Sequence, residues 1–187
     1  MSAQLVYVIG PSGAGKDSLL AWLREHMRAS APIHWARRCI TRPENAGGEN
    51  HESLSEIEFR QVLQERGFAL HWAANGLHYG IRHKELAPLR NKNWVMLNGS
   101  RAHLEQAVRQ YPGMTVLHIT ASPEILRSRL ISRGRETADA IDARIHRAVN
   151  MQWPADCHLI EVSNNESLQT AGEQLLHKLR NLGDWPS

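Results

Sequence analysis

The amino-acid sequence predicts an α/β fold, in which helices on both faces cover a mainly parallel sheet. Apolar runs of about five residues alternate along the chain with longer amphipathic stretches, a pattern typical of strands joined by crossover helices. The chain has 187 residues, of which 42% are hydrophobic and 22% charged, and this size suits one domain with small inserts. We therefore expect a single domain that spans residues 1–187.

The apolar and amphipathic runs also predict the individual elements. The expected strands cover residues 5–9, 33–40, 94–97, 115–120 and 158–162. The expected helices cover residues 16–28, 101–110, 123–133, 139–152 and 166–182.

The segment from about 41 to 89 interrupts this alternation. It begins with a loop rich in Gly and Asn, and Ser55 and Glu58 then form a capping box ahead of an amphipathic helix. Short strands are expected at 68–73 and 77–79. We interpret this segment as an insert in a core made of residues 1–40 and 90–187, because about 50 residues could hardly sustain a core of their own.

Composition excludes several classes of function. The formal net charge of +3 is too small to indicate nucleic-acid binding, and no apolar run approaches the roughly 20 residues that a membrane span needs. Cys39 and Cys157 are far apart and the 11 histidines are scattered, so neither a disulfide framework nor a metal cluster is indicated. We expect a cytoplasmic protein without nucleic-acid or membrane partners; the sequence predicts no oligomeric state.

The most informative motif lies between the first strand and the first helix. It has the spacing G-x-x-x-x-G-K, in which backbone N–H groups converge on phosphate oxygens and the lysine reaches the outer phosphates. The predicted nucleotide-binding residues are Gly10, Pro11, Ser12, Gly13, Ala14, Gly15, Lys16, Asp17 and Ser18. The motif predicts a nucleoside triphosphate site of the P-loop type, with Lys16 as a catalytic residue.

The motif departs from its usual form at Asp17, where a Ser or Thr hydroxyl normally meets Mg²⁺. A carboxylate is a good Mg²⁺ ligand, so Asp17 can bind the ion, with Ser18 as a second oxygen ligand. The alternative is an acidic residue that only stabilises the first turn of the helix through the helix dipole. Both interpretations stay open at this point.

A basic cluster follows the expected helix at 123–133. Arg129 and Arg133 are four residues apart, and Gly134 ends the helix before Arg135. Arginines at such a corner can close over a triphosphate and neutralise the group in transfer, so Arg133 and Arg135 are predicted catalytic residues of a lid at about 133–140. Arg127 and Arg147 are better explained as solvated surface residues.

These motifs together resemble the guanylate kinase family of nucleoside monophosphate kinases. The glycine-rich loop, Thr41-Arg42-Pro43, Trp72-Ala73, Tyr79-Gly80 and Arg133-Gly134 occur in the family's order over nearly the whole chain. The resemblance implies a three-layer P-loop core that carries ATP, an acceptor-binding insert and an Arg-bearing lid. It also implies an adenine-contacting loop at 163–165.

The acceptor pocket departs from the family's pattern. Asn45 replaces a second arginine, His51 a phosphate-binding tyrosine, His71 a base-recognising glutamate, and Ile81 a threonine. Guanine presents N–H donors that need an acceptor, and a site built for such hydrogen bonds discriminates strongly. GMP is therefore a poor candidate substrate.

The aspartate after the lysine and the altered pocket are similar to one subfamily, the ribose 1,5-bisphosphate phosphokinases of phosphonate catabolism. This resemblance implies transfer of phosphate from ATP, with Mg²⁺, to ribose 1,5-bisphosphate, which yields 5-phosphoribosyl 1-diphosphate (PRPP). Arg42 and Tyr79 are the family-supported ligands of one substrate phosphate. We expect His71, His78 or Arg82 to help with the other, although ordinary packing explains His78 equally well.

Two alternatives stay open. One is a guanylate kinase that acts on GMP, which His71, Ile81 and Asn45 disfavour. The other is a non-catalytic interaction module that uses the acceptor groove to bind a peptide. Retention of Gly15, Lys16, Arg133 and Arg135 argues against it, because a scaffold has no use for a triphosphate cradle.

Overall fold

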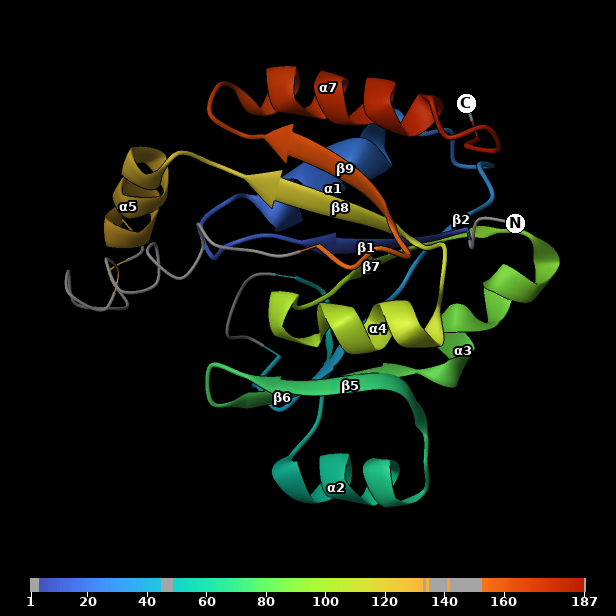
Figure 1. Cartoon of the computed structure of the whole chain (residues 1–187). Helices are drawn as coiled ribbons and strands as arrows, with labels where there is room; N and C mark the ends of the chain where they lie inside the picture. Colours follow the sequence, from blue (N-terminus) through green and yellow to red (C-terminus); the bar gives the residue numbers. More distant parts are fainter. Residues whose placement is uncertain (1–3, 45–48, 133, 135–140, 142–152, 187) are drawn as a thin grey trace.

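The computed structural model describes residues 4–44, 49–132, 134, 141 and 153–186, and its larger sheet confirms the predicted α/β class (Figure 1). Five parallel strands form this sheet in the order β2-β7-β1-β8-β9. The strands are β1 (Leu5–Ile9), β2 (Ile33–Trp35), β7 (Trp94–Asn98), β8 (Thr115–Thr120) and β9 (His158–Ser163). The predicted strands at 5–9 and 115–120 match these bounds, and those at 94–97 and 158–162 are each one residue short.

Helices cover both faces of the five-stranded sheet (Figure 1). Side chains alternate along β1, so Val6 and Val8 pack with α1 (Lys16–His26) and α7 (Leu168–Arg180). Leu5, Tyr7 and Ile9 pack on the other face, where α4 (Leu104–Gln110) and the second sheet lie. The core is therefore three layers thick, as the P-loop class requires.

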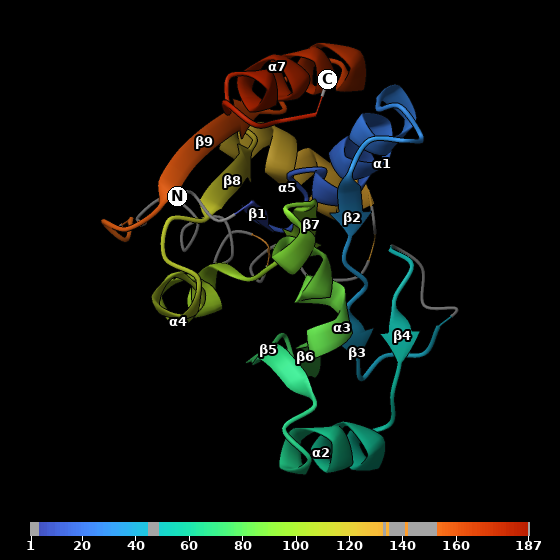
Figure 2. The ribbon, with the colours of Figure 1, turned by 90° about the vertical axis from the view of Figure 1, so that its right-hand side faces the viewer.

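A second sheet of four strands lies beside α4, and its order is β4-β3-β6-β5 (Figure 2). The strands are β3 (Cys39–Ile40), β4 (Glu52–Ser53), β5 (Phe68–Ala74) and β6 (Leu77–Arg82). Helix α2 (Glu56–Gln64) covers its far face, where the rings of Phe59 and Phe68 are 4.6 Å apart. The predicted capping box is confirmed, because the Glu58 N–H donates to Ser55 Oγ at 3.2 Å and the Ser55 N–H donates to Glu58 Oε2 at 2.7 Å.

The prediction of one continuous strand at 33–40 is wrong. Strand β2 belongs to the larger sheet and β3 to the second sheet, so residues 36–38 carry the chain from one to the other. Between them the Arg37 N–H donates to the carboxylate of Glu85 at 2.9 Å instead of to a strand partner. An apolar run can therefore span two sheets when a side chain binds the backbone at the crossing.

The remaining helices agree with the predictions within a few residues. The run at 101–110 divides into a 3-10 turn, η2 (Arg101–His103), and α4, and the run at 123–133 forms α5 (Pro123–Ser132). Two short helices, α3 (His83–Leu86) and η1 (Ala87–Asn91), lead from β6 to β7. The helix predicted at 139–152 lies almost entirely outside the described residues. Among the helices that the structure describes, none combines the length and the apolar composition that a bilayer crossing requires.

Candidate functional site: a phosphate loop facing an acceptor wall

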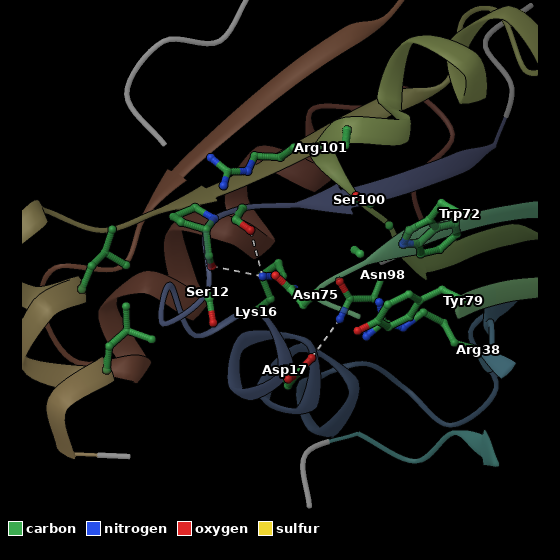
Figure 3. A pocket seen from close by; sticks show the side chains of 17 residues that line it. Ser12, Lys16, Asp17, Arg38, Trp72, Asn75, Tyr79, Asn98, Ser100 and Arg101 are labelled. Carbon is green, nitrogen blue, oxygen red and sulfur yellow. Dashed lines mark hydrogen bonds between the residues drawn. The ribbon is translucent and has the colours of Figure 1, made fainter. Parts of the chain in front are cut away.

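A cavity of about 590 Å³ opens at the carboxyl ends of β1 and β7 and extends to the β5–β6 hairpin (Figure 3). Ligands of parallel α/β sheets bind at this end of the strands. On one side the cavity is lined by the glycine-rich loop after β1, which we call the phosphate loop (residues 10–18). On the other side lies the acceptor wall, which we define as Arg38, Trp72, Asn75 and Tyr79.

The phosphate loop adopts a conformation that requires glycine at its last turn. Gly15 directly precedes α1 with φ of 84°, and a Cβ there would lie 2.3 Å from Nδ2 of Asn164. The same Nδ2 donates a hydrogen bond of 2.8 Å to the carbonyl of Ala14. The loop is therefore held from outside while its inner side faces the cavity.

Lys16 lines the cavity from the first position of α1. Its Nζ donates to the carbonyl oxygens of Gly10 and Pro11 at 3.0 and 3.1 Å, so the side chain lies along its own loop. Burial, which disfavours the charged form, lowers the pKa of Lys16 to about 8. Nearby Asp17 opposes this shift, whereas Arg38 and Arg101 add to it.

Asp17 also lines the cavity, and Asn98 at the end of β7 fixes its orientation. The Asn98 Nδ2 donates to Asp17 Oδ1 at 2.9 Å, while Oδ1 of Asn98 is buried without a hydrogen-bond partner among the described residues. Ser18 is exposed and does not line the cavity, since adjacent helix residues point in different directions. The pair predicted to bind a metal is therefore not brought together around the cavity.

Arg129 braces the phosphate loop from the side of α5. Its guanidinium donates to the carbonyl oxygens of Gly13 and Asn164 at 3.3 and 3.1 Å. The segment 163–165, which the family resemblance assigns to adenine contact, thus supports the loop through Asn164. Arg133 and Arg135 lie outside the described residues, while Gly134 has φ of 62°, in agreement with the predicted end of the helix.

The hairpin separates the predicted acceptor residues into two groups. Trp72 pairs with Tyr79 across the strands, both line the cavity, and their rings stack with centroids 5.6 Å apart. His71 pairs with Gly80 and so lies on the opposite face, because side chains alternate along a strand. Tyr79 faces the cavity as predicted; His71 does not.

Arg82 lies on the same outer face as His71, toward α2. Its Nη2 and Nε donate to the carboxylate of Glu52 at 2.6 and 3.1 Å, and its Cζ lies 5.8 Å from the ring centroid of Phe68. Hydrogen bonding to Arg82 lowers the pKa of Glu52, so the pair stays ionised. The prediction that Arg82 reaches a substrate phosphate therefore conflicts with its position. His78, whose ring is 5.4 Å from that of Phe59, packs on this face too.

Arg42 lies in the loop that joins β3 to β4 and does not line the cavity. Its Nη2 is 3.3 Å from Nδ1 of His51, and its Nε is buried without a hydrogen-bond partner among the described residues. Asn45, the second position of the altered pocket, lies outside those residues. Arg42 therefore presents a buried donor next to a segment that the structure does not describe.

Five polar cavity residues were not predicted from the sequence: Arg38, Asn75, Asn98, Ser100 and Arg101. The Cζ of Arg38 lies 5.1 Å from the ring centroid of Tyr79. Asn98 is the last residue of β7, and Arg101 follows it by three positions. A search for polar residues directly after each predicted strand could have found both, since these strand ends meet at one edge of the sheet.

The fold and the site define a class. A strand, a glycine-rich loop and a helix that begins with lysine, all at the edge of a parallel sheet, form a P-loop phosphotransferase core of the nucleoside monophosphate kinase type. The fold is similar to a guanylate kinase from Anaplasma phagocytophilum, with a TM-score of 0.58, 18% identity, and 96% and 85% of the two chains covered. A sugar kinase from Janibacter sp. is also similar, with a TM-score of 0.52, 16% identity and 92% of each chain covered. No family model matches the chain.

Curated relatives identify the family. The relative from Burkholderia pseudomallei is 46% identical over 183 residues, which cover 97% of this chain and 98% of the relative. That from Thiobacillus denitrificans is 45% identical over 176 residues, 94% of this chain and 92% of the relative. One from Laribacter hongkongensis is 47% identical over 94% of this chain, which spans 42% of that longer protein. All three are named ribose 1,5-bisphosphate phosphokinase PhnN. The chain belongs to the ribose 1,5-bisphosphate phosphokinase family.

Proposed function

We propose that this protein transfers the terminal phosphoryl group of ATP to the 1-phosphate of ribose 1,5-bisphosphate, which yields PRPP and ADP in phosphonate degradation. The observation that carries the proposal is the charge of the cavity. Its described lining contains the cations Lys16, Arg38 and Arg101, and Asp17 is its single carboxylate. A lining of this kind suits phosphorylated ligands on both sides of the transferred group.

GMP fits this cavity poorly. The two guanine N–H donors are best matched by a carboxylate, and the one carboxylate of the described lining, Asp17, lies on α1, where Asn98 binds it. His71 occupies the position of the family's base-recognising glutamate and belongs to the opposite face of the hairpin. A buried donor without a partner costs roughly 1–3 kcal/mol, so guanine would bind weakly.

The proposed reaction needs positioning and charge more than it needs a general base. The acceptor oxygen belongs to a phosphate with a second pKa of about 6, so it is already an anion at neutral pH. Backbone N–H groups of the phosphate loop hold the ATP phosphates, and Lys16 neutralises the outer ones. Arg133 and Arg135 are the proposed lid residues that stabilise the phosphoryl group in transfer.

Mg²⁺ fits the cavity through Asp17. No group of three or more His, Cys, Asp or Glu side chains that could hold a metal occurs in the described part of the chain. Mg²⁺ commonly binds through one or two carboxylates, water and substrate phosphates, and Asp17 supplies one such carboxylate with its orientation fixed by Asn98. When bound, the ion neutralises charge on the phosphates of ATP. Ser18 is a weaker candidate because it does not line the cavity.

Tyr79 is the acceptor residue that the cavity supports, because it faces the cavity beside Trp72. Arg42 is kept from the family resemblance: it does not line the cavity, but its buried Nε has no hydrogen-bond partner among the described residues and can donate to a phosphate oxygen. His71 and Arg82 are not part of the proposed site, because both lie on the outer face of the hairpin, away from the cavity.

The test is a comparison of acceptors with purified protein, ATP and Mg²⁺. We expect ADP release and formation of the diphosphate product with ribose 1,5-bisphosphate, and a kcat/KM for GMP lower by about 10²-fold. Comparable turnover of GMP would identify a guanylate kinase instead. If calorimetry detects no binding of Mg-ATP, the protein is a non-catalytic module.

A further inference from the structure

Two arginines line the cavity without a role in the P-loop motif or in the family's acceptor pattern. Arg38 lies in the crossing segment between β2 and β3, and Arg101 begins the turn after β7. Figure 3 shows Arg101 extending on the side of the phosphate loop and Arg38 beside Tyr79 at the other end. The cavity thus carries a guanidinium toward each of its two ends.

Arg38 is held rigidly in its position. Its Nε donates to Glu49 at 2.9 Å, its Nη2 donates to the other oxygen of that carboxylate, and its Cζ lies over the ring of Tyr79. Only 12% of its side chain is exposed. Glu49 occupies the Nε edge of the guanidinium, so the Nη1 edge is the one that can bind a ligand oxygen. An arginine ordered in this way loses little entropy when it binds a phosphate.

Arg101 belongs to the end of the cavity that the phosphate loop lines (Figure 3). Its turn is anchored because the Ser100 N–H donates to the buried hydroxyl of Tyr7 at 3.0 Å. Arg101 also helps to lower the pKa of Lys16, as Arg38 does with a larger effect, although burial is the largest cause. Two like charges near each other destabilise the free protein, and an anion between them removes this cost.

We propose, resting on the proposed function, that Arg38 and Arg101 select an acceptor with two phosphate groups. Arg38, together with Tyr79, binds the phosphate remote from the reaction, and Arg101 binds the phosphate that receives the transferred group. The cavity then recognises its acceptor by the separation of two anions, whereas a nucleoside monophosphate kinase recognises a base. These two residues therefore determine the acceptor class.

Calorimetric titration with three ligands tests each end separately. The ligands are ribose 1,5-bisphosphate, ribose 5-phosphate, which has only the remote phosphate, and ribose 1-phosphate, which has only the receiving one. We expect Arg38→Gln to weaken the bisphosphate and ribose 5-phosphate by about 30-fold, with ribose 1-phosphate changed less than about 3-fold. We expect Arg101→Gln to weaken the binding of ribose 1-phosphate and to leave the binding of ribose 5-phosphate nearly unchanged. Equal weakening of all three ligands by either variant, or no weakening, overturns the proposal.

Two further variants control for structural damage. Arg60→Gln removes an exposed arginine of α2 that pairs with Glu56, and it should leave all three affinities unchanged. Because Arg38→Gln leaves Glu49 without its partner, the double variant Arg38→Gln/Glu49→Gln restores a neutral hydrogen-bonded pair and should keep the loss of affinity for ribose 5-phosphate. Recovery of wild-type affinity in the double variant contradicts a direct role for Arg38.

The binding data separate this proposal from the proposed function. If the wild-type protein binds the bisphosphate through both arginines but releases no ADP, the proposed function fails and the two-anion site stands. The opposite result is also possible: the wild-type protein makes PRPP, but Arg38→Gln and Arg101→Gln do not each weaken a different monophosphate. In that case the proposal for the two arginines is wrong and the proposed function stands.

Discussion

The phosphate loop and the acceptor wall bound the same cavity but bind their ligands through different parts of the chain. The phosphate loop consists of consecutive residues whose backbone faces the cavity, and Asn164 and Arg129 brace it from outside. The acceptor wall consists of side chains from the β2–β3 crossing, β5, the hairpin turn and β6. Changes in the loop should therefore affect every acceptor equally, whereas changes in the wall should alter the choice of acceptor.

The two regions also differ in what a substitution removes. Phosphate binding by backbone N–H groups is lost only when a substitution distorts the loop or removes Lys16. A wall of side chains can be changed one group at a time, since each residue comes from its own element. The following predictions test whether this division between the regions is real.

The largest effect should come from Lys16→Ala. The substitution removes the cation that contacts the outer phosphates, and losses of this kind lower kcat by about 10²–10³-fold. Because the loop serves every acceptor, the loss should be the same for ribose 1,5-bisphosphate and for ribose 1-phosphate. ADP release measures the effect, and circular dichroism and thermal unfolding confirm the fold. Near-wild-type turnover by a folded variant would refute the role of Lys16.

The next effect should come from Gly15→Ala, which distorts the cradle without removing a charge. The left-handed φ of 84° and a Cβ 2.3 Å from Asn164 Nδ2 force the loop to move, at a cost of about 1–3 kcal/mol in the free energy of unfolding. Mg-ATP affinity should fall by at least about 10-fold.

Gly76→Ala provides a matched control for this substitution. Gly76 also has a left-handed φ, of 74°, but a Cβ there meets nothing within 4 Å, so only the backbone cost of about 1 kcal/mol remains. Urea unfolding should separate the two variants, and Gly76→Ala should leave Mg-ATP affinity unchanged. Equal effects of both substitutions would show that Asn164 does not brace the loop.

The same division explains which parts of the site the sequence could predict. The β1 strand, the phosphate loop and the start of α1 follow from local spacing, since glycine, lysine and the flanking apolar run lie within a few positions of one another. The capping box of α2 is local in the same sense. Lid residues Arg133 and Arg135 lie outside the described residues and stay predictions.

The acceptor wall could not be predicted in this way because it depends on strand register. The pairing of β5 with β6 shifts between Phe68 and Leu70, so Phe68 faces α2 while Leu70 and Trp72 face the core. His71 was expected at the substrate from the family resemblance alone, and the alternation of side chains along β5 places it on the face opposite Leu70 and Trp72. No local pattern distinguishes Arg38 from the other arginines, since only the crossing between the two sheets brings it to the site, whereas Arg101 lies just after the strand predicted at 94–97.

A smaller effect should come from Asp17→Ser, which restores the hydroxyl that this motif usually carries. If Asp17 binds Mg²⁺, the concentration of Mg²⁺ for half-maximal activity should rise by about 10-fold, while KM for the acceptor changes by less than about 2-fold. Activity measured across a Mg²⁺ titration at fixed ATP checks this. An unchanged titration curve would leave Asp17 as an acidic residue that stabilises the helix terminus.

The smallest effect concerns the pH dependence of ATP binding. Burial lowers the pKa of Lys16 to about 8, so this lysine loses its charge in the free protein as the pH rises through that value. ATP binds the protonated form, and its affinity should therefore fall by about 3-fold between about pH 7.5 and about pH 8.5. The stability of the free protein should change in the opposite direction. The unfolded chain, in which Lys16 keeps its ordinary pKa of 10.5, holds the proton longer, so this group makes folding more favourable as the pH rises above about 8.

Lys16→Arg separates this titration from other groups in the cavity. Arginine stays charged throughout this range, so the fall in ATP affinity should disappear even if the affinity itself is lower. Calorimetry with Mg-ATP at several pH values, in buffers with different heats of ionisation, also measures the proton taken up on binding by the wild-type protein. A pH dependence that survives in Lys16→Arg would assign the titration to another group. In that case the phosphate loop, like the acceptor wall, would depend on side chains that its local sequence does not reveal.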